Sequence, residues 1–311
     1  MDFLTDPFSL TFMQRGLIAG LLAGLSCGVV GVWVVLRRVV FMGDAMAHGI
    51  IPGIAVAYLI GAALPLGAAI SAVVMIGGIS LVSRLRRLGE DTGIGLLFVG
   101  MLAIGVLIIS RSGSFAVDVS HILFGDPLGV STGDLALSAA SAGAVLAVVL
   151  AGHRAFLALA FDPRKAQMLG LRPGVARVVL LGLVAAAVVA SFQAVGALLV
   201  FALIVAPAAA AALLVRRAAT MMLVAVALSW SAVVIGLLAS YHLDLASGAA
   251  IAVTAVLQFF LIAIGDTVRE RVRRQRVASD NGSHLQWPSG VEPAADTAPV
   301  DPVRDAETIR R

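Results

Sequence analysis

Long apolar runs separated by short polar segments occupy the chain from residue 15 to residue 265. Each run is about 20 residues long, the length that an α-helix needs to cross the hydrocarbon core of a bilayer. Nine runs can be placed: 15–36, 41–60, 65–83, 92–110, 133–151, 177–197, 199–215, 219–239 and 245–265. The seventh run is short and contains Pro207, so eight full spans plus a re-entrant or broken helix is the alternative. The pattern predicts an all-α polytopic membrane protein.

The composition agrees with a protein that is built into lipid. Of its 311 residues, 60% are hydrophobic and 13% are charged, whereas a soluble domain has about 25% charged residues. So few charges cannot cover a water-facing surface, which makes the lipid bilayer an expected partner. The single cysteine excludes an intrachain disulfide. A cleaved signal peptide is not expected, because Asp2 and Asp6 stand where a basic segment would lie.

Basic residues gather after the odd-numbered runs. They are Arg37 and Arg38; Arg84, Arg86 and Arg87; Arg154, Arg164, Lys165 and Arg172; Arg216 and Arg217; and Arg269, Arg271, Arg273, Arg274 and Arg276. Odd runs of a nine-span chain all end on one side, and basic loops stay in the cytoplasm. We therefore expect the N-terminus outside and the C-terminus in the cytoplasm. The net charge of +4 then reflects topology, and no nucleic-acid partner is expected.

The chain divides into three segments by composition. Residues 1–12 form a short N-terminal segment, and residues 13–270 form the transmembrane domain. From about residue 277 the sequence is rich in Pro, Asp and Ser and poor in large apolar residues. Such a composition cannot bury enough apolar surface to fold, so residues 271–311 are predicted to form a disordered cytoplasmic tail.

Two ionisable residues stand near the start of the second run, in FMGDAMAHGIIPG (41–53). Asp44 and His48 are four positions apart, so on a helix they share a face one turn apart. Each is costly in hydrocarbon, about 2.5–3.5 kcal/mol for an Asp at a helix centre, so both should face protein or water. Pro52 has no N–H, which would leave the carbonyl of His48 without its helical donor.

Carboxylate and imidazole together suit a divalent cation such as Zn²⁺ or Mn²⁺, which makes Asp44 and His48 candidate metal ligands. On spacing alone, the alternative is that Asp44 caps the start of the helix and His48 makes an ordinary hydrogen bond near the interface. One pair also supplies too few ligands, and a two-fold dimer would double it to four groups around an axis.

The longest cytoplasmic loop contains FDPRKAQMLGLRPG (161–174). Its chemistry predicts a short capped helix, with Asp162 as N-cap, Pro163 at the first helical position and Gly170 at the stop. Such a helix could dock a cytoplasmic partner, and a plain connector on the membrane surface is the alternative. The candidate docking residues are Phe161, Asp162, Pro163, Arg164, Lys165, Ala166, Gln167, Met168, Leu169, Gly170 and Leu171.

Lys165 is the only lysine of the chain, and Ala166 follows it. A phosphate-binding loop of the Walker type requires a glycine-rich run that ends in Lys and then Ser or Thr. The chain therefore has no such nucleotide site, and any ATP that drives it must be bound by another subunit. We expect a transport subunit rather than an enzyme, without a bound cofactor.

Several other features have simpler readings. Gly16, Gly20, Gly24 and Gly28 recur every fourth residue of the first run, which predicts close packing against another helix. His121, His242 and Asp244 lie in outer loops and receive no assigned role.

The segments that carry these features resemble, in order, the permease subunit of bacterial ABC importers for zinc, manganese or iron(II). The matching segments are 15–61; 90–108 (EDTGIGLLFVGMLAIGVLI); 122–131 (ILFGDPLGVS); 161–171 (FDPRKAQMLGL); 193–214 (QAVGALLVFALIVAPAAAAALL); and 243–251 (LDLASGAAI). Together they extend over about residues 12–265. Arg164 and Lys165 depart from the acidic and aromatic residues that relatives often have there.

The resemblance implies a fold similar to the vitamin B12 and siderophore type of importer permease, in a bacterial cell membrane. It implies two copies around a shared pathway, two cytoplasmic ATPase subunits and an extracytoplasmic metal-binding protein. It also implies that Asp44 and His48 lie on the path of a divalent metal ion as transported substrate, and that 161–171 is the coupling helix. The alternative is a secondary carrier driven by an ion gradient, which would need more intramembrane acids. A membrane anchor or receptor would leave Asp44 and His48 unexplained.

Overall fold

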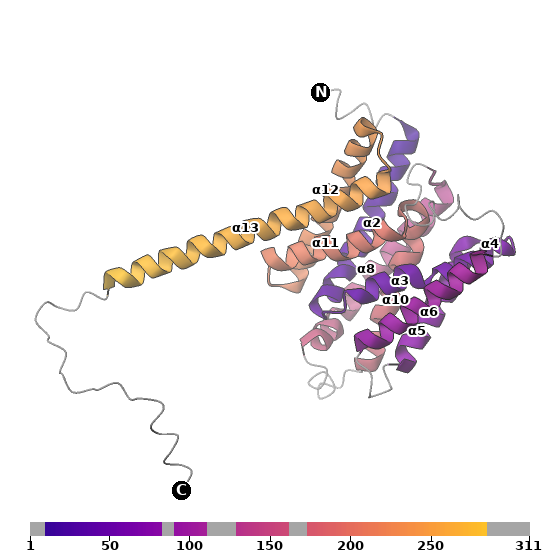
Figure 1. Ribbon diagram of the computed structural model, residues 1–311, viewed down its shortest axis with the longest axis horizontal. Helices are drawn as coiled ribbons and strands as arrows, with labels where there is room; N and C mark the ends of the chain where they lie inside the picture. The colour runs from indigo at the N-terminus through magenta and orange to yellow at the C-terminus, as the bar shows by residue number, and fades with distance from the viewer. Residues whose placement is uncertain (1–9, 83–89, 111–128, 162–172, 285–311) are drawn as a thin grey trace, which may run out of the picture. The chain divides into compact units, whose positions relative to one another are not determined.

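The computed structural model describes residues 10–82, 90–110, 129–161 and 173–284, and every regular element within these ranges is a helix. Figure 1 shows them as α2 (Thr11–Leu36), α3 (Phe41–Gly49), α4 (Ile51–Leu59), α5 (Leu64–Val82), α6 (Glu90–Ser110), α8 (Thr132–Phe161), α10 (Pro173–Val195), α11 (Ala197–Leu214), α12 (Ala218–Leu243) and α13 (Ser247–His284). The all-α fold class is therefore confirmed.

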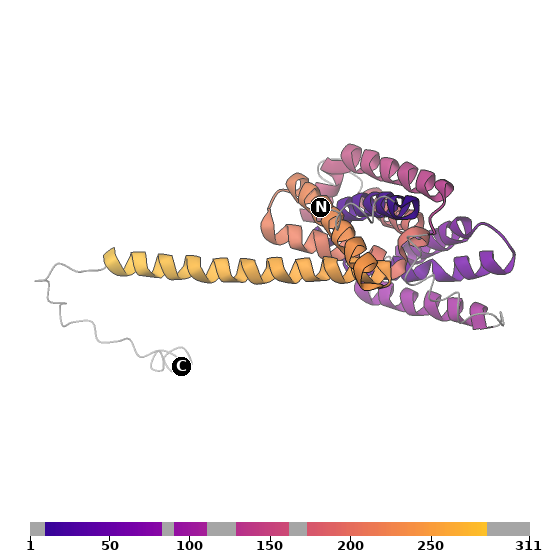
Figure 2. The ribbon, with the colours of Figure 1, turned by 90° about the horizontal axis from the view of Figure 1, so that it is seen from above.

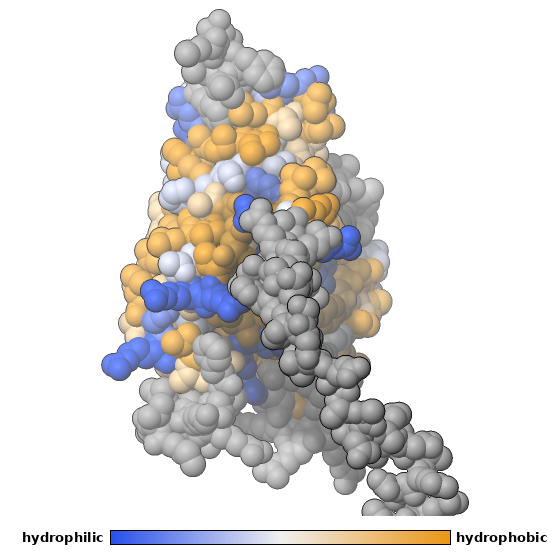
Figure 3. Space-filling model, turned by 90° about the vertical axis from the view of Figure 1, so that its left-hand side faces the viewer, coloured by the Kyte–Doolittle hydropathy of each residue, from blue (hydrophilic) through white to orange (hydrophobic). Residues whose placement is uncertain are grey.

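Within these ranges, eight segments are long and apolar enough to cross a membrane. α3 and α4 together make one of them, and α11 is a shorter apolar helix that contains Pro207. The eight-plus-one arrangement thus describes the chain better than nine equal spans. Large apolar side chains remain exposed on α5, α6, α12 and α13, and much of the face in Figure 3 is apolar. Such an apolar surface suits lipid rather than water.

The second span is broken at Ile50, where α3 ends and α4 begins. The break has a local cause, because Pro52 cannot donate to the carbonyl four residues before it and its ring clashes there. Pro52 lies instead in the first turn of α4, where helices have no intrahelical partner for an N–H in any case. The sequence predicted one continuous run over 41–60, and the proline divides it.

α2 is largely buried and contacts α8, α10, α11 and α12. Figure 2 shows its dark indigo ribbon inside the bundle, next to α8. Gly20 faces Val233 of α12, while Gly24 and Gly28 face Ser229 of the same helix. The glycines of the first run therefore pack closely against another helix, as predicted, because the missing side chains let α12 approach.

The remaining sides of α2 bury large side chains. Cys27 and Trp33 have no exposed surface. The Trp33 ring lies 5.4 Å from the ring of His153 and 5.6 Å from that of Phe156, both on α8. These contacts join the first span to the fifth, about 120 residues later in the chain.

α4 and α5 cross at two glycines. A Cβ on Gly53 would collide with the carbonyl of Gly67, and a Cβ on Gly67 would collide with the carbonyl of Gly53. The backbones can approach this closely only because neither residue has a side chain. The crossing fixes the broken span against α5.

The chain separates into two compact units, Met1–Asp266 and Thr267–Arg311. α13 is helical to His284 and so extends into the segment 271–311 that the composition predicts to be disordered. The reason is local, because Glu, Arg, Gln, Val and Ala in RERVRRQRVA favour or tolerate helix, and proline is absent until residue 288. Residues 285–311 lie outside the described part of the chain, and the limits of the three predicted segments remain predictions.

The glycine crossing gives a first prediction. Gly67→Ala should lower the free energy of unfolding by about 1–3 kcal/mol, because its methyl group would overlap α4. Gly77→Ala on the same helix has open space around it and should have little effect. Thermal unfolding of the two purified variants in detergent measures the difference, and equal melting temperatures would contradict the close crossing.

Candidate metal site

α3 places Asp44 in its first turn and His48 in its last turn. A carboxylate is favoured near a helix N-terminus and an imidazolium near a C-terminus. The residue that caps the helix is Val40, which makes no side-chain cap hydrogen bond. Asp44 is therefore not the helix cap that the simpler sequence reading proposed.

The two side chains come together as their spacing predicted. His48 Nδ1 lies 3.3 Å from Asp44 Oδ1 and 3.1 Å from the carbonyl oxygen of Asp44. Both partners are acceptors, so Nδ1 carries the hydrogen, and in the neutral ring Nε2 keeps its lone pair. The side chains of His48 and Asp44 are 15% and 22% exposed, so the pair is largely enclosed yet reachable.

The backbone carbonyls at the helix break accept hydrogen bonds from neighbouring groups. The hydroxyl of Ser71, on α5, donates to the carbonyl of Gly49 at 2.8 Å in a buried position. The N–H of Ile50 donates to the carbonyl of His48. The helical donor that Pro52 cannot supply to this carbonyl is thus replaced by the N–H of Ile50.

An aromatic pair borders the site. The ring of Phe98, on α6, lies 5.5 Å from the His48 ring at an interplanar angle of 83°. Phe41 lies 5.6 Å from Phe98 at 70°. Sequence reasoning missed Phe98 and Ser71, since both lie in continuous apolar runs where no local pattern separates them from packing residues.

The pair does not form a complete metal site by itself. In the part of the chain that the structure describes, no three His, Cys, Asp or Glu side chains come close enough to hold one ion. Zn²⁺ is usually four-coordinate, and Mn²⁺ takes more ligands. A metal ion held by this pair would therefore need ligands beyond the described side chains, such as water or groups of another chain.

The other sequence candidates lie apart from this pair or outside the described residues. Phe161 ends α8, and 162–171 lie outside the described ranges, as does His121. His242 is exposed at the end of α12 beside Tyr241, with the rings 5.3 Å apart. Asp244 ends α12 in a left-handed conformation with φ of 51°.

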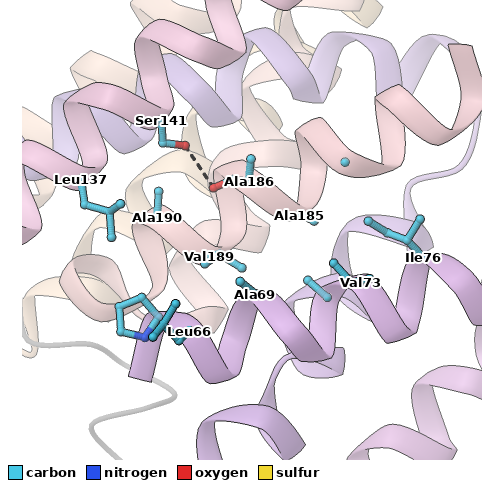
Figure 4. A pocket seen from close by; sticks show the side chains of 13 residues that line it. Leu66, Ala69, Val73, Ile76, Leu137, Ser141, Ala185, Ala186, Val189 and Ala190 are labelled. Atoms are coloured by element: carbon cyan, nitrogen blue, oxygen red, sulfur yellow. Dashed lines mark hydrogen bonds between the residues drawn. The ribbon is translucent and has the colours of Figure 1, made fainter. Parts of the chain in front are cut away.

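A cavity of about 450 Å³ lies between α5, α8 and α10 (Figure 4). Its lining includes Leu66, Val73 and Leu137 and contains no charged residue. The hydroxyl of Ser141 donates a hydrogen bond to the carbonyl of Ala186 at 3.2 Å. An ion without its water would find no ligand there, so this cavity is not a metal site.

The model of the ABC 3 transport family matches residues 9–266. The chain belongs to that family. It is 37% identical over 263 residues to the chelated iron transport system membrane protein YfeD of Yersinia pestis, covering 85% of this chain and 88% of that protein. It is 36% identical to the manganese transport system membrane protein MntC of Halalkalibacterium halodurans, covering 83% of this chain and 89% of that protein.

A solved structure is similar to this chain in fold and in sequence. The structure of PsaBC from Streptococcus pneumoniae in complex with Fab matches with a TM-score of 0.76 and 28% identity, covering 84% of this chain and 94% of that chain. With its membrane-spanning helices, this ABC 3 family member is the membrane permease of an ABC transporter. Its expected class as a transport subunit is confirmed.

The bond at the helix break generates a prediction for this permease. Ser71→Ala should lower the free energy of unfolding by about 0.5–2 kcal/mol, because the buried Gly49 carbonyl loses a donor. Ser110→Ala is the control, since Ser110 is exposed and donates to Leu107 within its own helix. Thermal unfolding of both variants is the measurement, and an unchanged Ser71→Ala protein would show that the bond contributes nothing.

Proposed function

We propose that the chain is the permease subunit of an ATP-driven importer that moves a divalent transition-metal ion, with Asp44 and His48 as its ligands along the path. One observation carries this proposal: the carboxylate and the imidazole are paired within one turn of a membrane-spanning helix. Intramembrane ionisable groups are costly, and those that persist usually serve a transport pathway. Binding of the ion must remain weak enough to allow its release.

The choice of metal follows from ligand chemistry and from the relatives. Carboxylate and imidazole accept Zn²⁺, Mn²⁺ and Fe²⁺ alike. The relatives carry manganese or iron in their names, which favours Mn²⁺ or Fe²⁺ over Zn²⁺ as the substrate of this chain.

The incomplete ligand set supports a second copy as partner. A two-fold axis near α3 would bring a second Asp44 and a second His48 to the same ion, giving four protein ligands. Two such pairs can hold a metal that one pair cannot. Release then requires only that the two copies move apart.

The topology supports an orientation and a set of partners. With the arginine-rich turns in the cytoplasm and α11 as a ninth, shorter crossing, the N-terminus would lie outside and the C-terminus inside. The segment from Phe161 to Leu171 then faces the cytoplasm, where it can couple the permease to ATPase subunits. An extracytoplasmic metal-binding protein would deliver the ion from the opposite side.

Replacing the ligands tests the proposal directly. Asp44→Asn and His48→Gln should each reduce uptake of Mn²⁺ or Fe²⁺ by roughly 10- to 100-fold or more, because each removes a ligand and leaves the shape nearly unchanged. Asp134→Asn is the matched control, since the hydrogen bonds described for that carboxylate are local ones from Ser131 at the start of α8.

The measurement is initial uptake of each metal by a deletion strain that carries the variant, with the amount of inserted protein determined in parallel. Normal uptake by both site variants would reject the metal-ligand role. Gradient-driven transport by the chain in vesicles without an ATPase would instead support a secondary carrier.

The coupling segment has its own test. If Gly170 ends a helix with positive φ, Gly170→Val should weaken association with the ATPase, because a β-branched residue is strained there. Gly174→Val is the control, since Gly174 has open space around it. Co-purification with the ATPase and stimulation of ATP hydrolysis are the measurements, and equal results for both variants would contradict the assignment.

A further inference from the structure

The orientation of the His48 ring needs more than the hydrogen bond to Asp44. The torsion that turns an imidazole about its Cβ–Cγ bond has a broad energy profile, so the ring plane is set by contacts and not by the side chain itself. The contacts of Nδ1 with Asp44, at 3.3 Å and 3.1 Å, involve one edge of the ring. Both contacts share one hydrogen and are longer than the usual N–H···O distance of about 2.9–3.0 Å, so they restrain rotation about the Cβ–Cγ bond only loosely.

The Phe98 ring restricts this rotation. It stands nearly perpendicular to the imidazole, at 83° with ring centres 5.5 Å apart. Perpendicular aromatic pairs at such distances are favoured over parallel sandwiches, because the positive edge of one ring meets the negative face of the other. A turned imidazole would lose this arrangement.

Phe98 also contacts α3, the helix that carries Asp44 and His48. Phe41, the first residue of α3, lies 5.6 Å from Phe98 at 70°. Gly95, one turn earlier on α6, lies beside Phe41, since a Cβ there would be 3.7 Å from its ring, an ordinary contact distance. One aromatic ring of α6 is thus supported by Phe41 and contacts His48.

We propose that Phe98 is a positioning residue for transport, which holds the His48 ring so that Nε2 is presented to the ion. This inference rests on the proposed function of Asp44 and His48. With Nδ1 committed to Asp44, Nε2 is the only ring nitrogen left for a metal, and its direction follows the ring plane. Loss of Phe98 would let Nε2 point away for part of the time and weaken binding of the ion.

The test measures Mn²⁺ uptake against Mn²⁺ concentration for the full-length permease, expressed with its transporter partners in a deletion strain. Phe98→Leu keeps an apolar side chain but removes the ring. It should raise the apparent KM by about three- to tenfold, the range that corresponds to one aromatic pair, while Vmax stays within about twofold. Phe98→Tyr keeps the ring and should restore the KM of the unmodified protein.

Phe260→Leu is the matched control. Phe260 makes a similar contact with Phe259, with ring centres 5.4 Å apart at 67°, on α13. It should leave KM unchanged, because its described ring contact is to another phenylalanine. Phe41→Leu is a second variant, which should raise KM in the same sense but by less, since Phe41 acts through Phe98.

The outcomes separate this inference from the function on which it rests. An unchanged KM in Phe98→Leu, or a fall only in Vmax and inserted protein, would show that Phe98 serves packing alone. Failure of Phe98→Tyr to restore KM would also overturn the inference. Asp44→Asn, measured in the same strain, reports on the metal-ligand role separately, because normal uptake by that variant would reject the proposed function itself.

Discussion

A broken helix in a membrane has to find partners for its backbone inside the protein, since hydrocarbon offers none. In this permease the break follows from Pro52, and Ser71 of the neighbouring helix supplies the donor for the carbonyl of Gly49. The serine can reach that carbonyl because Gly53 and Gly67 let the two backbones nearly touch. The position of the polar pair on α3 depends on this arrangement, because it sets where α3 ends.

The break also explains why a costly pair can be accommodated at this place. A helix of nine residues brings both of its ends close together, so that Asp44 lies near one end of α3 and His48 near the other. Each end carries a partial charge that favours the side chain beside it. An uninterrupted span from Phe41 to Leu59 would keep Asp44 in its first turn but would place no helix C-terminus beside His48. The fold therefore lowers the cost of the two groups while leaving them partly exposed.

Most of the fold follows from the sequence, because apolar length and the placement of arginines are strong signals in a membrane protein. The spacing of Asp44 and His48 also predicted their contact, since residues four apart must meet on a helix. The way the broken span is held against α5 did not follow, because it depends on Ser71 and Gly67 of α5, which are distant in the sequence. Phe98 could not be found either, since its contact with His48 is made between helices 50 residues apart in the chain. Long-range contacts of apolar residues leave no local pattern in the sequence.

The single cysteine of the chain has a practical consequence. Cys27 is enclosed within the bundle by α2 and its neighbours, with none of its surface exposed. Buried thiols in apolar surroundings react slowly, because the thiolate form is needed for attack. We therefore expect water-soluble thiol reagents not to modify Cys27 in the unmodified protein. A cysteine introduced elsewhere, for example beside Asp44 and His48, would be the one accessible thiol of the chain, so the rate of its modification would report when water reaches that position.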